Sequence, residues 1–320
     1  MTGFKAGHSA KFEVKKVVSW VGTALMVVSL GFIISRLRTY GLDLSLLSSP
    51  FVVMALFFVV VVESFGIIVA SVNYRAILQN VSGIKVPGSL VTLVYSISNL
   101  YKYIPGGVMY VVGRNRLAVE TEGLSHAKVA LATIMEGALV IIAALIVSLV
   151  FSFEYTVYHI RQLVLSPFFV ISVTIVVLII CTALYFLHGK IKQRIQDFFS
   201  TVEILKPSVI VKRFGIATFL VLMLGMTFTA VVMLMGQPMT ASLAVTLAGL
   251  YLVSWMAGFL TPGAPSGLGI REVVMLMLMS GLVIESVLLI AMIMHRVVII
   301  LGDVLAYCIS VLYKKTRGSG

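Results

Sequence analysis

The sequence predicts an all-α polytopic membrane protein built as an inverted-topology repeat. Of its 320 residues, 60% are hydrophobic and only 11% are charged, whereas ordinary soluble domains contain roughly 25% charged residues. The mean hydropathy is +1.11, and the longest apolar runs reach the roughly 20 residues that a membrane-spanning helix needs. Two further apolar regions are broken by Pro and Gly at matching places, which is a common sequence sign of a transport site between two repeats.

Six uninterrupted apolar runs have the length of a membrane span: 17–37, 51–72, 126–152, 167–187, 214–236 and 285–312. Two more regions are interrupted by Pro and Gly: 89–119 and 241–283. In each, a Pro-Gly pair is followed by an arginine nine residues after the proline, so that Pro105 precedes Arg114 and Pro262 precedes Arg271. Irregular backbone and buried guanidinium groups are costly in hydrocarbon, so membrane proteins keep them where they line a cavity or bind a ligand.

The distribution of basic residues sets the expected orientation, because Lys and Arg gather in cytoplasmic loops. Segment 188–212 is strongly basic, and so are the amino terminus, the loop 73–88 and the carboxyl-terminal tail. All four lie on one side only if 89–119 and 241–283 each enter the membrane and return as a hairpin of two short helices. We therefore expect two re-entrant hairpins and a multi-pass protein of the plasma or inner membrane with both termini in the cytoplasm.

This arrangement makes residues 1–320 one integral membrane domain with two units of the same order and opposite orientation. The expected parts are unit 1 (51–152, with hairpin 89–119), a peripheral span and basic cytoplasmic loop (153–212), and unit 2 (213–313, with hairpin 241–283). Spans 17–37 and 167–187 are then peripheral supports. The alternative is that the two Pro-Gly breaks are unrelated kinks.

The glycine-rich breaks are candidate anion sites. A glycine-rich turn that begins a short helix presents free N–H groups and the positive end of the helix dipole, both of which attract anions. The arginine fork binds phosphate bidentately and stays charged when desolvated. The candidate headgroup-binding residues are Arg114, Arg271, Glu272, Gly106, Gly107, Gly267 and Gly269. The alternative for each arginine is a side chain that extends to the membrane interface and only sets topology.

A second set of candidates forms an expected intramembrane charge network, since ionisable residues in spans face the interior and pair with one another. Its members are Glu63, Lys102, Glu136, His295, Arg296 and Asp303. We expect Glu136 to pair with Arg296 or Arg271. Glu63 is either a proton-coupling site or the partner of a cation such as Lys102. A purely structural role for these pairs stays open.

Other classes of function have little support in the sequence. The net charge of +12 follows from basic loops between apolar runs rather than from a nucleic-acid surface. Cys181 and Cys308 each lie in an apolar run, so we expect packing residues and neither a disulfide framework nor a metal site. The three Asp residues form no paired acidic motif, so we expect no catalytic residues, no cofactor and no enzyme.

The two broken regions resemble the conserved blocks of the lysylphosphatidylglycerol synthase transmembrane-region family. The first block is Asn99 followed by Y-I-P-G-G, G-R-N-R and G-L-S, with the intramembrane Glu136. The second is P-G-A-P-S-G-L-G-I-R-E followed by His295-Arg296. Two departures concern headgroup preference: the acidic residue that often stands between Gly and Arg in the first block is absent, and Gly137 stands where the family often has Arg.

The resemblance implies lipid translocation, because the family includes the flippase portion of the bacterial multiple peptide resistance factor. Its matching functional candidates are Arg114, Glu136, Arg271, Glu272 and Arg296. The expected substrate is an anionic phospholipid or polyprenyl-phosphate lipid, such as an aminoacylated phosphatidylglycerol. The alternatives are a membrane assembly partner for a cytoplasmic glycan- or lipid-modifying enzyme, recruited through 188–212, and an intramembrane transferase. Gly-rich spans also permit a homodimer.

Overall fold

The structure is a computed structural model that describes residues 48–103, 109–164, 207–261 and 265–317. Within these residues the chain is helical and contains no β-strand. Five of the described helices are long and apolar enough to cross a membrane: α2, α5, α7, α8 and α10. The prediction of a helical, multi-pass membrane protein is therefore confirmed. The predicted spans 17–37 and 167–187 and the basic segment as far as residue 206 lie outside the described residues.

The first half of the described chain runs from α2 to α5. Its elements are α2 (Pro50–Ser82), α3 (Gly88–Leu100), the 3₁₀ turn η2 (Tyr101–Tyr103), α4 (Met109–Glu122) and α5 (His126–Val164). Proline at the first helical position begins α2. Gly83 ends the helix with φ of +73°, and its N–H donates a 2.9 Å hydrogen bond to the carbonyl of Gln79. A glycine in this left-handed conformation is the usual end of a helix. The helices α3 and α4 lie on either side of the first Pro-Gly break.

The second half repeats this order. Its elements are α7 (Pro207–Leu234), α8 (Ala241–Leu260), the 3₁₀ turn η3 (Pro265–Gly267), α9 (Ile270–Met279) and α10 (Glu285–Arg317). Thr240 caps α8 by accepting a 3.2 Å hydrogen bond from the N–H of Leu243, as N-cap threonines commonly do. The sequence predicted two short helices in 241–283, but α8 has 20 residues whereas α3 has 13. Its apolar run ends only at the break, so α8 reaches the length of a span.

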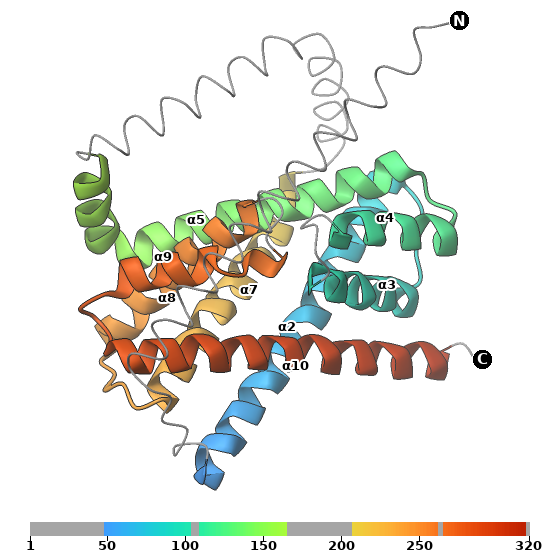
Figure 1. The fold of residues 1–320 in the computed structure, drawn as a ribbon. Helices are drawn as coiled ribbons and strands as arrows, with labels where there is room; N and C mark the ends of the chain where they lie inside the picture. The colour runs from blue at the N-terminus through green and yellow to red at the C-terminus, as the bar shows by residue number, and fades with distance from the viewer. Residues whose placement is uncertain (1–47, 104–108, 165–206, 262–264, 318–320) are drawn as a thin grey trace, which may run out of the picture.

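The contacts between helices match between the two halves. Helix α5 packs against α8 as α10 packs against α3, and α2 packs against α10 as α7 packs against α5. Helices α2 and α7 also pack against each other, and the turns η2 and η3 are in contact. Figure 1 shows α3 and α4 at the end of the bundle where α10 finishes, and α8 and α9 at the end where α10 begins. The two broken regions thus approach one another from opposite ends of the long helices.

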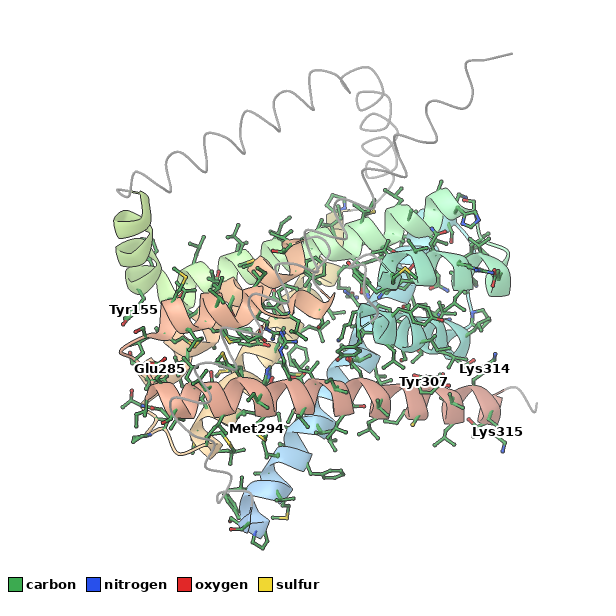
Figure 2. The ribbon with its side chains drawn as sticks, viewed as in Figure 1. Tyr155, Glu285, Met294, Tyr307, Lys314 and Lys315 are labelled. Carbon is green, nitrogen blue, oxygen red and sulfur yellow. The ribbon has the colours of Figure 1, made fainter. Side chains whose placement is uncertain are left out.

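Basic side chains gather at one end of the bundle. Figure 2 shows Lys314 and Lys315 at the end of α10 that lies far from Tyr155 and Glu285. The end of α2 lies beside this basic end, because a Cβ added at Gly88 would be 3.3 Å from the Arg75 guanidinium and 3.7 Å from the Tyr313 hydroxyl. Lys128 at the start of α5 donates a 2.9 Å hydrogen bond to the carbonyl of Ser82. The ends of α2 and α10 and the start of α5 therefore share one basic region.

Two apolar clusters hold the helices together. One cluster joins α7, α8 and α10 around fully buried side chains such as Phe228, Tyr251 and Leu288. The other joins α2, α3 and α5 around side chains such as Tyr74 and Val129. Large apolar side chains also cover the outside, including Phe51, Phe57, Phe58 and Phe65 on α2, which are all more than half exposed. Exposed apolar surface of this extent is expected where helices face lipid.

Candidate functional site

Arg114 and Arg271 each lie over a tyrosine ring that comes from the helix before the break. The guanidinium carbon of Arg114 is 4.0 Å from the centroid of Tyr95, and that of Arg271 is 4.6 Å from the centroid of Tyr251. The two tyrosines are 156 residues apart (251 − 95) and the two arginines 157 (271 − 114). Cation–π contact with a tyrosine face is favourable, and more so where both groups are desolvated.

The correspondence between the surroundings of the two arginines extends one helical turn beyond each tyrosine. Ser98 and Ser254 each stand three residues after their tyrosine and donate to its carbonyl, at 2.8 Å and 2.7 Å. Both serines are completely buried. The local surroundings of the two arginines are therefore built twice from corresponding residues, and what differs is the set of ionic partners.

Arg114 is held by partners within its own half of the chain. Its Nη1 lies 2.6 Å from Glu136 Oε2, and its Nε donates to Ser98 Oγ at 3.1 Å. The hydroxyl of Tyr95 donates to the second oxygen of Glu136 at 2.8 Å. The predicted pairing of Glu136 with Arg271 or Arg296 is therefore wrong: α4 packs directly against α5, so the carboxylate meets the arginine of its own half first.

Arg271 has no such partner. Its side chain is buried, and among the described residues its Nη2 has no hydrogen-bond acceptor. The adjacent Glu272 is already engaged: one oxygen accepts a 2.7 Å hydrogen bond from the N–H of Gly269, and the other pairs with Arg296 on α10. A buried donor without an acceptor costs stability, so this orphan donor requires an explanation.

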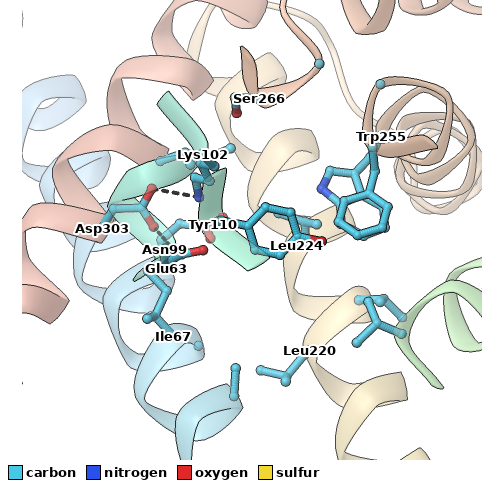
Figure 3. A pocket seen from close by; sticks show the side chains of 18 of the residues that line it. Glu63, Ile67, Asn99, Lys102, Tyr110, Leu220, Leu224, Trp255, Ser266 and Asp303 are labelled. Atoms are coloured by element: carbon cyan, nitrogen blue, oxygen red, sulfur yellow. Dashed lines mark hydrogen bonds and ion pairs between the residues drawn. The ribbon is translucent and has the colours of Figure 1, made fainter. Parts of the chain in front are cut away.

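Arg271 lines a cavity of about 270 Å³ between the two halves of the chain. Figure 3 shows Glu63, Lys102 and Asp303 facing this space, with Trp255 and Leu224 across from them. The polar lining includes Glu63, Asn99, Lys102, Arg271 and Asp303; the apolar lining includes Ile67, Val140, Leu220, Leu224, Trp255 and Phe259. The cavity is therefore polar in one part and apolar in another.

Asp303 ties the first break to α10. Its carboxylate accepts from Lys102 Nζ at 2.7 Å and from Asn99 Nδ2 at 2.6 Å, and the hydroxyl of Tyr103 also donates to it. The dashed line in Figure 3 marks the contact with Lys102. The sequence offered Lys102 as a partner for Glu63, but the lysine pairs with Asp303, because α3 packs against α10 and η2 directly follows α3.

Glu63 has a hydroxyl and an imidazole as its near partners. Its Oε1 accepts from the hydroxyl of Thr227 on α7, and His295 Nε2 lies 3.8 Å away. The other ring nitrogen of His295 lies 3.3 Å from the hydroxyl of Tyr251, the residue beneath Arg271. Sequence reasoning did not find Thr227 or Tyr251. The shared Tyr-x-x-Ser register of Tyr95 and Tyr251 is the signal that could have identified the second.

Two glycines let the second break pack tightly on α8. Gly267 has φ of +66° and Gly269 has φ of +91°. Residues other than glycine rarely adopt these backbone angles. A Cβ at Gly267 would come within 2.6 Å of the Cα of Gly258. Gly106 and Gly107, their counterparts in the prediction, lie outside the described residues.

Most of the predicted residues gather in one region. Glu63, Lys102, Gly267, Arg271 and Asp303 line the cavity, and Glu272, His295 and Arg296 are linked to them through the contacts described above. Arg114 and Glu136 form a separate buried pair, connected to the cavity by Tyr95. Tyr110, Trp255 and Ser266 also line the cavity and were not predicted as site residues.

No protein-family model matches the chain, and no curated protein matches it. Among the residues that the structure describes, no group of three or more His, Cys, Asp or Glu side chains could hold a metal ion.

Proposed function

We propose that the protein binds a phosphate-bearing membrane lipid at Arg271 and moves it between the leaflets. The observation that carries the proposal is a buried arginine in the wall of a partly polar, partly apolar cavity, whose Nη2 has no hydrogen-bond acceptor among the described residues. Arginine presents a planar fork that matches phosphate oxygens. A phosphate group would supply the missing acceptor, and the apolar part of the cavity would receive the first carbons of the lipid chains.

The contrast between the two arginines supports Arg271 as the phosphate ligand. Both arginines contact a tyrosine face and have corresponding neighbours, but the charge of Arg114 is neutralised by Glu136. A buried ion pair that is already complete gains little from a second anion. Arg271 is the member of the pair that keeps its charge available to a ligand.

An inverted repeat would explain how such a site opens to both sides. The matching contacts of α5 with α8 and of α10 with α3 support two halves related by a pseudo-two-fold axis. The positions of the two broken regions at opposite ends of the bundle support hairpins that enter from opposite faces (Figure 1). By the positive-inside rule, the end that carries Arg75, Lys128 and Lys314 would face the cytoplasm.

Alternating access would then come from rocking one half against the other around a fixed binding site. The contact between η2 and η3 lies where the two broken regions meet. Lys102 and Asp303 form an ion pair across the halves at this place. Breaking and reforming this pair would let the cavity face one leaflet at a time.

Translocation can be tested in vesicles that contain the purified protein and a fluorescently labelled phosphatidylglycerol, with an impermeant reductant that quenches only the outer leaflet. We expect Arg271→Ala to slow translocation roughly tenfold to a hundredfold, because a charge-assisted hydrogen bond contributes about 1.5–3 kcal/mol. Arg116→Ala is the matched control, since Arg116 is an exposed arginine paired only with Glu120. Wild-type translocation by the Arg271→Ala protein would show that the proposal is wrong.

A further inference from the structure

We infer that Glu63 is a proton-binding site coupled to the anion site at Arg271, so that lipid binding and uptake of one proton at Glu63 favour each other. This inference rests on the proposed function, because it concerns how the same cavity balances the charge of its ligand. The observation behind it is that the partners of Glu63 differ in kind from those of the other buried carboxylates in the described residues.

Four carboxylates are buried in the part of the chain that the structure describes: Glu63, Glu136, Glu272 and Asp303. Three of them are each held by a cation, which is Arg114 for Glu136, Arg296 for Glu272 and Lys102 for Asp303. A carboxylate beside a fixed cation is stabilised in its charged form. Within the described residues, Glu63 alone of the four has no Lys or Arg at ion-pair distance; its near partners are a hydroxyl and an imidazole.

The hydroxyl of Thr227 can serve either protonation state of Glu63. Its Oγ1 donates to Glu63 Oε1 and lies only 3.0 Å from the carbonyl oxygen of Leu224. A hydroxyl has one donor and two acceptor positions and can rotate. When Glu63 is charged, Thr227 donates to the carboxylate. When Glu63 carries a proton, the carboxyl group donates to Thr227, and Thr227 turns its own proton to Leu224.

The charge balance of the cavity gives protonation its role. The charged side chains that line it are the paired Lys102 and Asp303, together with Arg271 and Glu63. Without ligand, Glu63 balances Arg271. A phosphate anion on Arg271 would leave Glu63 as an excess negative charge in a poorly solvated space, where like charges repel strongly. One proton on the carboxylate of Glu63 restores neutrality.

The other ionisable groups near Glu63 come from every helix packed around it. Helix α9 contributes Arg271, which lines the same cavity. Helix α10 contributes His295, whose ring contacts Tyr251 and Phe228, and Asp303 with its lysine; α7 contributes the hydroxyl of Thr227. On α5 and α3, Glu136 and Tyr95 bond to each other and to Arg114. His295 is the alternative proton acceptor, because its Nε2 lies 3.8 Å from Glu63.

The test is calorimetric titration of the full-length protein in detergent with dihexanoyl phosphatidylglycerol, whose phosphodiester does not change charge around neutral pH. Repeating the titration in buffers with different heats of ionisation gives the number of protons taken up per lipid bound. We expect about one proton for wild type and, since binding takes up a proton, an affinity that falls by up to about tenfold per pH unit as pH rises. Glu63→Gln should bind the lipid with no proton uptake and with little dependence on pH.

Two further variants keep the result interpretable. Glu120→Gln changes an exposed carboxylate and should show the proton uptake of wild type. Thr227→Val removes a hydroxyl whose hydrogen bond to charged Glu63 is stronger than its bond to the neutral carboxyl, so its loss favours the protonated form and the proton uptake on binding should fall. This variant serves if Glu63→Gln does not fold.

The outcomes separate the two proposals. Lipid binding by wild type without proton uptake, or undiminished uptake in Glu63→Gln, would overturn the coupling and leave the phosphate site standing; the second result would point to His295. No binding of the lipid to wild type would overturn the proposed function and this inference together. Loss of proton uptake in Glu63→Gln with binding retained would support both.

Discussion

At the scale of single residues, two arginines with corresponding neighbours differ in their ionic partners. Arg114 and Arg271 both contact a tyrosine face and both are buried. Glu136 pairs with Arg114, whereas Glu272, the carboxylate next to Arg271, pairs with Arg296 on α10. Arg114 therefore has a complete ion pair, whereas Arg271 has no ion-pair partner among the described residues.

This difference predicts opposite effects of truncation on stability. Arg114→Ala should lower the free energy of unfolding by about 3–5 kcal/mol, because it leaves Glu136 buried without its cation. Arg271→Ala removes a guanidinium that has no ion-pair partner among the described residues, so its loss of stability should be much smaller. Thermal unfolding of the two variants in detergent, followed by size exclusion, measures the difference. Equal destabilisation would contradict the assignment of roles.

At the scale of elements, the turn between α8 and α9 places Arg271. Gly267 lies against Gly258 of α8, and the Glu272 carboxylate binds the N–H of Gly269 at the start of α9. Such a cap satisfies one of the free N–H groups of a helix start. Within residues 265–269, which the structure describes, the turn is closely packed at Gly267 and capped at Gly269, and its shape depends on these two glycines.

A methyl group at this turn should disrupt the site. Gly267→Ala brings a Cβ within 2.6 Å of the backbone of Gly258, at a φ of +66°. The backbone strain of alanine at this φ lowers the free energy of unfolding by on the order of 1–3 kcal/mol. The overlap of its Cβ with Gly258 lowers it by a similar amount. We expect a lower melting temperature and loss of lipid binding.

Gly137→Ala is the matched control for this change. A Cβ at Gly137 meets no atom within 4 Å, and the residue lies inside α5. Because alanine favours the helix by up to about 1 kcal/mol relative to glycine, this variant should be as stable as wild type or more stable. A Gly267→Ala protein that behaves like the Gly137→Ala protein would refute the packing argument.

At the scale of the whole molecule, the orientation of the two broken regions decides which sides the connecting loops face. If 89–119 enters and returns, then Lys85 before α3 and Ser125 after α4 lie on one side of the membrane. If 241–283 does the same, Pro238 and Ser280 lie together on the other side. A single crossing by either region would separate the members of its pair.

Cysteine labelling tests this topology directly. Single cysteines at Lys85, Ser125, Pro238 and Ser280, in a chain whose two native cysteines are replaced by alanine, are exposed to an impermeant maleimide in intact and in opened cells. We expect Lys85→Cys and Ser125→Cys to react only after the cells are opened, since basic loops stay in the cytoplasm. Pro238→Cys and Ser280→Cys should react in intact cells. A split within either pair would contradict the hairpin arrangement.

Much of the architecture could be read from local patterns. The apolar run 285–312 lies within α10, and the run 51–72 lies within α2. Helix α2 continues ten residues beyond its apolar run, because Asn73, Tyr74 and their neighbours find partners inside the bundle. The breaks were predicted from Pro and Gly, and separate helices stand on either side of each one. The length of α8 was underestimated because its apolar run continues unbroken from residue 241 almost to the Pro-Gly pair at 262 and 263.

The sequence by itself determined that this is a helical membrane protein with two similar broken regions, because hydropathy, helix breaks and spacing are properties of neighbouring residues. Only the tertiary structure decided which charges meet. The pairs of Glu136 with Arg114, Lys102 with Asp303 and Glu272 with Arg296 depend on which helices pack together and how they are rotated. In a medium of low dielectric constant each charge pairs with the nearest opposite charge. That Arg271 has no ion-pair partner among the described residues could therefore be seen only once these neighbours were in place.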